Sequence, residues 1–268
     1  MARPLPWIGA TPWGVVVSEV MLQQTPASRV VRYWEPFLAR FPSPNDLVNA
    51  PISDVLEHWR GLGYPRRALR LREMARIVVE TFDGQIPTSV ETLRTLPGVG
   101  EYTAGAIASF AFGASEPVVD TNVGRVLARA LVAQSLRPSD ARRWARELLP
   151  TRDAPAFNQA LLDLGAQWCR PRPRCEKCPI RRACAWHQRG GEDPARGSAF
   201  VSRSQSPYAG SDREKRGLVL RHVSHHPTTL DHLATSTGMA RDDLERVVSS
   251  LVHDGFCDLA GEVVTWAR

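Results

Sequence analysis

The sequence predicts a mainly α-helical protein that ends in a small α/β module. Apolar residues recur at helical spacing from about Trp13 to about Trp186, with few alternating β-branched stretches and regular breaks at Pro or Gly. Residues 188–212 then turn to Gly, Pro, Ser and Arg with almost nothing to bury, which indicates a linker. Residues 213–268 mix helical spacing with two short strand patterns. We therefore expect a helical body, a linker and a second, smaller domain.

Three segments of the body carry the clearest helical pattern. Their apolar residues span 47–59, 69–78 and 90–96, and each segment has about the length of an ordinary helix. We expect one helix over each of these segments.

The order of the elements expected in residues 213–268 predicts a winged-helix-like domain. We expect a helix through Leu218–Val223, a helix begun by Thr228 and Thr229, and a longer helix from about Arg241 to His253. Two short strands follow, around 257–259 and 263–266. Winged helices bind DNA in some proteins and only pack or contact other proteins in others, and the sequence leaves both roles open.

Composition and charge narrow the classes of protein. The chain has 268 residues, 43% of them hydrophobic, which suffices for two lobes or for one large domain with an appended module. It has no apolar run of about twenty residues and no charged-then-apolar leader, so we expect neither a membrane span nor export. The net charge of +6 comes mainly from arginine, which favours a polyanionic partner, although a solvated basic surface would give the same composition.

Four of the five cysteines are clustered and predict a metal or iron–sulfur site. Cys169, Cys175, Cys178 and Cys184 lie within sixteen residues, and five arginines are interspersed among them. Disulfides are disfavoured in a protein that is not exported, and thiolates are soft ligands for zinc or for an iron–sulfur cluster. A zinc ribbon usually has two Cys-x2-Cys pairs and this segment has one, so a [4Fe–4S] cluster is favoured and zinc remains the alternative. Cys257 is interpreted as a core residue.

A glycine-containing turn separates two helical stretches. Leu96-Pro97-Gly98-Val99-Gly100 precedes a helix rich in small residues that begins near Glu101. Backbone N–H groups at the start of such a helix can hold a phosphate without reading a base. Most turns of this kind only connect helices, and that interpretation also stays open.

Two carboxylates are candidates for chemistry. Glu19 lies in an apolar run, Val15 to Leu22, where an acid is costly unless it has a partner or a function, and burial there would raise its pKa as a general acid requires. Asp120 precedes Thr121 in a position to cap a helix, and by itself that structural role is the favoured one.

These motifs, taken in order, resemble a known family. The segments that match are Ser18–Thr25, Gly61–Tyr64, Leu96–Gly100, Val119–Val123 and Cys169–Cys184. Together they cover roughly residues 5–187 and are similar to the MutY-type, A/G-specific adenine DNA glycosylases, helix-hairpin-helix iron–sulfur enzymes related to endonuclease III. The first two cysteines are separated by five residues here, whereas the family usually has six.

The resemblance implies a fold of two lobes. A six-helix lobe over residues 11–115 would face an iron–sulfur cluster lobe, made of residues 1–10 and 116–187, across a DNA-binding cleft lined by Glu19 and Asp120. The linker over 188–212 and the winged-helix-like domain over 213–268 would follow. This C-terminal domain does not resemble the Nudix-like domain with which many members recognise 8-oxoguanine.

The resemblance also implies catalytic roles. Glu19 would be the general acid that protonates adenine, and Asp120 would stabilise the oxocarbenium ion of the sugar. Tyr102 occupies the place where endonuclease III has its nucleophilic lysine, so the enzyme would be a glycosylase that does not cut the strand. Asn122 would help to order the active site.

DNA contacts are implied for a further set of residues. Gln24 and Tyr64 would enter the base stack opposite the flipped nucleotide. The remaining expected contacts are in the hairpin, at Leu96, Gly98, Val99 and Gly100.

The expected protein is therefore a monomeric base excision repair enzyme of the bacterial cytoplasm, associated with the nucleoid. Its partner would be double-stranded DNA that contains adenine mispaired with 8-oxoguanine or guanine. Two alternatives remain: a glycosylase of the same superfamily acting on T or U opposite G, and a non-catalytic iron–sulfur winged-helix regulator that binds DNA. The regulator would have no need of Glu19 and Asp120 close to phosphates.

Overall fold

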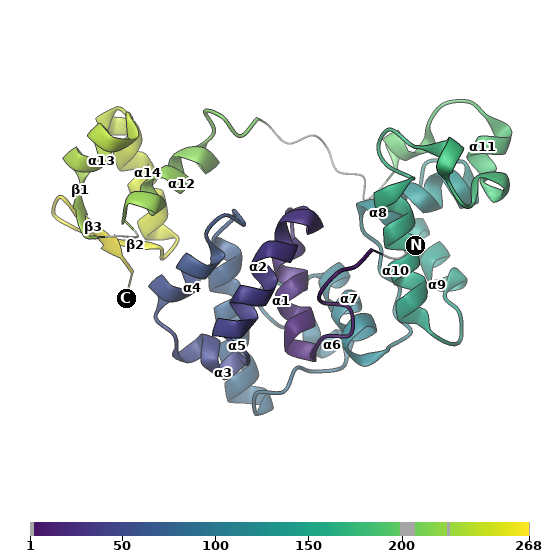
Figure 1. The fold of residues 1–268 in the computed structure, drawn as a ribbon, viewed down its shortest axis with the longest axis horizontal. Helices are drawn as coiled ribbons and strands as arrows, with labels where there is room; N and C mark the ends of the chain where they lie inside the picture. The colour runs from purple at the N-terminus through teal and green to yellow at the C-terminus, as the bar shows by residue number, and fades with distance from the viewer. Residues whose placement is uncertain (1–2, 199–206, 224–225, 268) are drawn as a thin grey trace. The chain divides into compact units, whose positions relative to one another are not determined.

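The computed structural model describes residues 3–198, 207–223 and 226–267 and is mainly helical, with one small three-stranded sheet (Figure 1). This confirms the predicted fold class. The chain divides into two compact units, one formed by Met1–Glu19 with Ile86–Ser204 and the other by Val20–Gln85 with Gln205–Arg268. No helix among the described residues is both long and apolar enough to cross a bilayer.

The first unit contains the start of α1 (Pro12–Leu22), the hairpin helices and the cysteine segment. Its further elements are α6 (Val90–Leu93), α7 (Glu101–Phe112), α8 (Thr121–Val126), the π-helix η1 (Leu127–Val132), α9 (Pro138–Leu148), α10 (Ala154–Gln167), the 3-10 turns η2 (Cys175–Lys177) and η3 (Arg181–Ala183), α11 (Ala185–Arg189) and the 3-10 turn η4 (Pro194–Gly197).

The core of this unit is built from α7, α8, η1, α9 and α10. Its buried members include Ala106, Val119, Val123, Leu127 and Leu162. Helices α8 and α10 approach closely because residue 165 is glycine: a Cβ atom there would lie 2.6 Å from Cβ of Asn122. This close packing fixes the helix that Asp120 caps.

The second unit begins with the end of α1 and continues through four helices. They are α2 (Ala27–Arg40), α3 (Pro44–Asn49), α4 (Ile52–Trp59) and α5 (Arg66–Phe82). The single helix expected over 47–59 is therefore wrong, because the segment is divided at Ala50 and Pro51. The proline disfavours helical backbone in the residue before it, and Ala50 is extended with ψ of 146°.

The C-terminal module has the predicted winged-helix-like order of elements. Its elements are α12 (Asp212–Val223), β1 (Thr228–Thr229), α13 (Leu230–Thr237), α14 (Arg241–His253), β2 (Cys257–Ala260) and β3 (Val263–Trp266). The strands form an antiparallel sheet in the order β1-β3-β2, with Thr228 opposite Val264 and Leu259 opposite Val264 on the other side. Cys257 is buried in the core of the module, as expected.

The start of helix α13 differs from the sequence prediction. Thr228 and Thr229 were expected to begin a helix, and they form the short strand β1. Thr229 also caps α13, because its side-chain oxygen accepts a hydrogen bond from the backbone N–H of His232. The threonine pair therefore starts the helix from a strand.

Part of the range expected to be a linker is packed. Helix α11 extends to Arg189, and the turn η4 has Pro194 and Ala195 buried. Asp193 forms an ion pair with Arg129 of η1. A compositional argument misses this packing because two small apolar residues and one buried ion pair are enough to anchor the segment.

Candidate active site and cysteine pocket

Glu19 is a buried acid with a raised pKa. It lies in α1, whose apolar residues Val15, Val16, Val17 and Val20 are all buried, and only 4% of Glu19 is exposed. Its Oε2 atom has no hydrogen-bond partner among the described residues. Burial, and then the negative charge of Asp120, raises the pKa of Glu19 to about 8, while a hydrogen bond from Tyr102 opposes the shift. The carboxyl group is therefore largely neutral at pH 7.

Tyr102 lies in the first turn of α7 and joins the hairpin to this acid. Its hydroxyl group hydrogen-bonds to the Glu19 side chain. Burial, together with the charge of Glu19, raises the pKa of Tyr102 well above its usual value. The hydroxyl group therefore stays protonated, and it cannot act as an amine nucleophile as a lysine would.

Asp120 caps α8 and also lies within electrostatic reach of Glu19. Its Oδ1 atom accepts hydrogen bonds from the backbone N–H groups of Asn122 and Val123, both at 2.8 Å. Its Oδ2 atom accepts a hydrogen bond from Nδ2 of Asn122 at 2.6 Å. Burial raises the pKa of Asp120, and these hydrogen bonds and the charge of Arg125 oppose the increase. The capping role expected for Asp120 is present, and the three donors favour its ionised form.

Asn122 connects Asp120 to the cysteine segment through Arg125. The Oδ1 atom of Asn122 accepts a hydrogen bond from Nη2 of Arg125 at 2.7 Å. Nε of Arg125 in turn donates a hydrogen bond to the carbonyl oxygen of Cys169 at 2.9 Å. The first cysteine of the cluster motif is thus two side chains away from the carboxylate pair.

The structure brings Glu19, Tyr102 and Asp120 together within one unit. Two carboxyl groups with different environments can divide acid and base work, because a buried carboxyl with a single hydroxyl donor keeps its proton, whereas three donors favour the ionised form. Glu19 has the first environment and Asp120 the second.

The turn before α7 has the geometry that its sequence predicts. The N–H of Val99 donates to the carbonyl of Leu96 at 3.2 Å, and Gly98 has φ of 78°, as the third position of a type II turn requires. Gly100 is the N-cap residue of α7. The Leu96 and Val99 side chains are buried, so this turn offers its backbone, rather than these side chains, to a ligand.

Gln24 and Tyr64 lie on two loops of the second unit. Gln24 is exposed and Tyr64 is partly buried, and both have left-handed backbone, with φ of 58° and 48°. The loops contact each other directly, since Oγ1 of Thr25 donates to the carbonyl of Leu62 at 3.1 Å.

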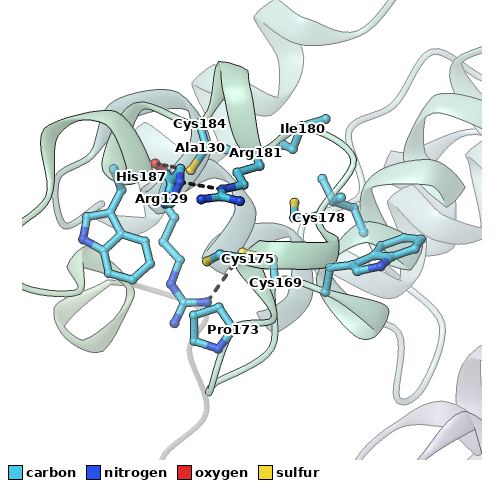
Figure 2. Close-up of a pocket in the computed structure, with 13 residues that line it drawn as sticks. Arg129, Ala130, Cys169, Pro173, Cys175, Cys178, Ile180, Arg181, Cys184 and His187 are labelled. Carbon is cyan, nitrogen blue, oxygen red and sulfur yellow. Dashed lines mark hydrogen bonds between the residues drawn. The ribbon is translucent and has the colours of Figure 1, made fainter.

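The four clustered cysteines line one pocket. Figure 2 shows Cys169, Cys175, Cys178 and Cys184 around a pocket that is partly open to solvent. Arg129, Arg181 and His187 also line it, so its surroundings are basic. Burial raises the pKa of the Cys169 thiol, and the neighbouring Arg129 opposes this increase.

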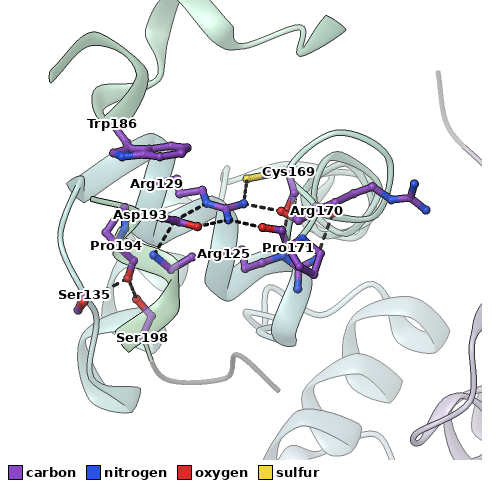
Figure 3. Close-up of polar contacts among 12 residues, drawn as sticks. Arg125, Arg129, Ser135, Cys169, Arg170, Pro171, Trp186, Asp193, Pro194 and Ser198 are labelled. Carbon is purple, nitrogen blue, oxygen red and sulfur yellow. Dashed lines mark hydrogen bonds and ion pairs between the residues drawn. The ribbon is translucent and has the colours of Figure 1, made fainter. Parts of the chain in front are cut away.

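Arg129 is a functional candidate that the sequence analysis missed. It is 1% exposed, and Figure 3 shows its guanidinium group between the cysteine segment and Asp193. It donates to both carboxylate oxygens of Asp193 at 2.7 and 2.6 Å, to Sγ of Cys169 at 3.5 Å, and to the carbonyl oxygens of Arg170 and Pro171 at 2.6 and 3.2 Å. The signal was available, because an arginine in the apolar run 126–132 raises the same question of burial as Glu19 does in α1.

Comparison with known proteins places these features in a family. The profile of the HhH-GPD superfamily of base excision DNA repair proteins matches residues 17–151. A protein of Mycolicibacterium smegmatis described as an adenine DNA glycosylase is 43% identical over 267 residues, which cover 96% of this chain and 88% of that protein. A protein of Aeropyrum pernix described as a thymine-DNA glycosylase is 38% identical over 195 residues, which cover 69% of this chain and 87% of that protein.

A solved structure supports the same assignment. A thermostable thymine-DNA glycosylase superposes with a TM-score of 0.64 and 29% identity, over 70% of this chain and 89% of that one. The near-complete match to the mycobacterial protein is the more specific finding, because it extends through the C-terminal module. The chain therefore belongs to the HhH-GPD superfamily of base excision DNA repair proteins and, within it, to the adenine DNA glycosylases.

Proposed function

We propose that this protein is a monofunctional DNA glycosylase that hydrolyses the N-glycosidic bond of adenine mispaired with 8-oxoguanine or guanine, in base excision repair. The observation that carries the proposal is the buried, largely neutral Glu19 beside Asp120, whose hydrogen bonds favour its charged form. Membership of the adenine DNA glycosylases supports adenine as the base removed.

Glu19 acts as the general acid. Adenine is a poor leaving group as an anion, and protonation of a ring nitrogen allows it to depart as a neutral base. An acid with a pKa of about 8 still holds its proton at neutral pH. Its Oε2 atom, which has no partner among the described residues, is suited to face the substrate.

Asp120 stabilises the positive charge that develops on the sugar as the bond to adenine breaks. A carboxylate held by three donors at 2.8 Å or less is fixed in place before the reaction and needs no reorganisation. Water then adds its oxygen to C1′ of the sugar and gives up its proton to the carboxylate pair. The products are free adenine and an abasic site, and the chemistry parallels glycoside hydrolysis.

The strand stays intact because Tyr102 supplies no amine. Strand cleavage through a Schiff base needs a lysine or amino terminus at the sugar, and Tyr102 has only a protonated hydroxyl group. Its function is to hold the Glu19 carboxyl group.

The DNA is double-stranded and the adenine leaves the base stack before it reacts, because the bond to be broken is inaccessible inside a duplex. Gln24 and Tyr64 fill the space on the opposite strand, and the backbone at 96–100 holds a phosphate. The protein acts as a monomer in the cytoplasm, at the nucleoid.

Cys169, Cys175, Cys178 and Cys184 would hold a [4Fe–4S] cluster in the pocket that they line. All four thiols line one hollow with basic neighbours, which suits a cluster whose thiolate ligands give it negative charge. The motif has one Cys-x2-Cys pair where a zinc ribbon usually has two, which favours a cluster over a single zinc ion. The bound cluster would cross-link this lobe.

Metal analysis tests the cluster separately from the activity. The purified protein should contain about four iron and four inorganic sulfide per chain, as this cluster type requires, and little zinc. One zinc per chain with no sulfide would contradict the cluster.

The second candidate is removal of thymine or uracil opposite guanine, which the match to the Aeropyrum pernix protein favours. Base release from a panel of duplexes separates the candidates. The panel holds A opposite 8-oxoguanine, G or C, and T or U opposite G. Fastest release of adenine opposite 8-oxoguanine supports the proposal, and release of only T or U contradicts it. Tight binding without release of any base would indicate the non-catalytic regulator.

A further inference from the structure

One buried arginine connects the two loops that carry Gln24 and Tyr64. Arg67 lies in the first turn of α5 and is 6% exposed. Its two terminal nitrogens donate hydrogen bonds to six oxygen atoms, of which five are backbone carbonyls. The acceptors are O of Val20 (3.0 Å), Met21 (2.7 Å) and Gln23 (2.5 Å) for Nη1, and Oγ1 of Thr25 (2.9 Å) with O of Leu62 (3.2 Å) and Gly63 (2.8 Å) for Nη2.

These acceptors belong to two separate stretches of chain. The first stretch is the end of α1 and the loop that follows it, and the second is the loop before α5. Each loop contains one non-glycine residue in the left-handed region, Gln24 in the first and Tyr64 in the second. Such backbone costs energy and persists only where the surroundings hold it.

The guanidinium group is also packed between aromatic rings. Its central carbon lies 5.4 Å from the ring centre of Trp59 and 5.5 Å from that of Tyr64. Nε1 of Trp59 donates to the carbonyl of Gly63 at 3.2 Å, which ties the same loop from its other side. Arg67 therefore contacts the backbone of both loops and the ring of Tyr64 itself.

Arg67 is an unusual choice for packing alone. All six of its described acceptors are neutral, so its buried charge is met by dipoles rather than by a carboxylate. Burial lowers its pKa to about 10, and it stays protonated at neutral pH. An apolar side chain would fill the volume without this desolvation cost, but a guanidinium group presents two terminal nitrogens in one plane and so can bond to both loops at once.

We propose that Arg67 is a positioning residue for base flipping: it locks the Gln24 loop and the Tyr64 loop in one arrangement, so that both side chains enter the DNA base stack together. This inference rests on the proposed function. It adds the residue that fixes the Gln24 and Tyr64 loops relative to each other. Loss of Arg67 should impair extrusion of the adenine and leave the bond-breaking step intact.

Arg67→Lys is the test variant, because lysine keeps the charge but cannot bond to six acceptors. Arg72→Lys is the matched control. Arg72 lies on the same helix, and in both arginines the buried Nε has no partner among the described residues. The Nη2 atom of Arg72 donates to the carbonyl oxygens of Val48 and Ala50, away from both loops.

Two duplexes separate flipping from chemistry. One holds adenine opposite 8-oxoguanine, and the other holds the same adenine opposite an abasic analogue, where extrusion costs less. Single-turnover adenine release is measured on both, and 2-aminopurine next to the target reports unstacking on binding. Arg67→Lys should slow release from the first duplex roughly tenfold to a hundredfold, change the second much less, and lose the 2-aminopurine signal. Arg72→Lys should keep the wild-type ratio of the two rates.

An equal loss on both duplexes, or the same change in ratio for Arg72→Lys, would overturn the proposal. The ratio is measured within each preparation, so partial unfolding of a variant scales both rates equally and does not alter it. Failure of the proposed function has another signature, because the wild-type protein would then release adenine from neither duplex. The 2-aminopurine comparison of wild type and variant would still test whether Arg67 governs unstacking.

Discussion

At the scale of single residues, the site depends on burying a carboxyl group where it is costly. Glu19 occupies a buried position in α1 among mostly apolar residues, and the fold accepts the acid only as a largely protonated group. Burial is the cause both of its raised pKa, which makes it a useful acid, and of its cost to the stability of the fold. Sequence reasoning could find Glu19 because one acid interrupts an apolar run. It could not give the Tyr102 hydrogen bond or the proximity of Asp120, which depend on packing of distant segments.

The cost of Glu19 should be visible in stability. The pKa of Glu19 is about 8 in the folded protein and 4.5 in the unfolded chain, so between these values the folded state holds a proton that the unfolded state has released. Stability therefore falls as pH rises through this window. Glu19→Gln should be more stable than wild type by roughly 2–3 kcal/mol at pH 7, with little difference at pH 4.5.

Melting temperatures at pH 5 and pH 7.5 check this prediction, with the exposed Glu35→Gln as control. The gap between Glu19→Gln and wild type should widen with pH, and the control should show no such trend. A gap that is the same at both pH values would mean that Glu19 ionises normally.

The pH dependence of catalysis should report the same proton. kcat/KM should fall above about pH 8, where Glu19 becomes ionised, and should also fall at acidic pH, where Asp120 becomes protonated. Because the Tyr102 hydrogen bond lowers the pKa of Glu19, Tyr102→Phe should move the alkaline limb to higher pH. An alkaline limb that stays in place in Tyr102→Phe would remove Glu19 as its source.

At the scale of elements, the cysteine segment is held by parts of the chain that its motif does not include. The four cysteines sit on short 3-10 turns and connecting loops, which have little structure of their own. The π-helix η1 supplies Arg129, and the segment around η4 supplies Asp193 to fix it (Figure 3). The cysteine spacing predicts the ligands, but the supporting ion pair joins residues 64 positions apart and has no local pattern.

Asp193→Asn should therefore loosen the proposed cluster without touching a cysteine. Removing the charge weakens the two hydrogen bonds that orient Arg129, which in turn contacts Sγ of Cys169. Iron release to a chelator should become roughly tenfold faster than in wild type. Asp212→Asn, which breaks an exposed pair with Arg246, is the control and should release iron at the wild-type rate. Equal rates in all three proteins would show that the ion pair does not support the cluster.

At the scale of the whole molecule, the C-terminal module has the elements of a winged helix but not the charge of a DNA reader. Sequence order was enough to predict these elements, except for β1, whose two residues are too few to form a pattern. Both arginines of α14 are engaged in ion pairs. Arg241 pairs with Asp231, Glu245 and Glu262, and Arg246 pairs with Asp212 and Asp243. This pairing favours a packing role over DNA binding.

The salt dependence of DNA binding tests that role. Each phosphate contact contributes about one unit to the slope of log affinity against log salt. Arg241→Gln and Arg246→Gln should leave this slope and the affinity for a mispaired duplex unchanged. A slope that falls by about one unit for either variant would show that α14 contacts the phosphate backbone.

In the proposed mechanism Glu19 delivers the proton that releases adenine, and single-turnover release from a duplex with adenine opposite 8-oxoguanine measures this step. Glu19→Gln should bind this duplex as tightly as wild type and release adenine at least a hundredfold more slowly, as expected for loss of a general acid. Ser18→Ala, a change at the neighbouring buried residue of α1, should keep most of the activity. Release by Glu19→Gln at a rate close to that of wild type would contradict the mechanism.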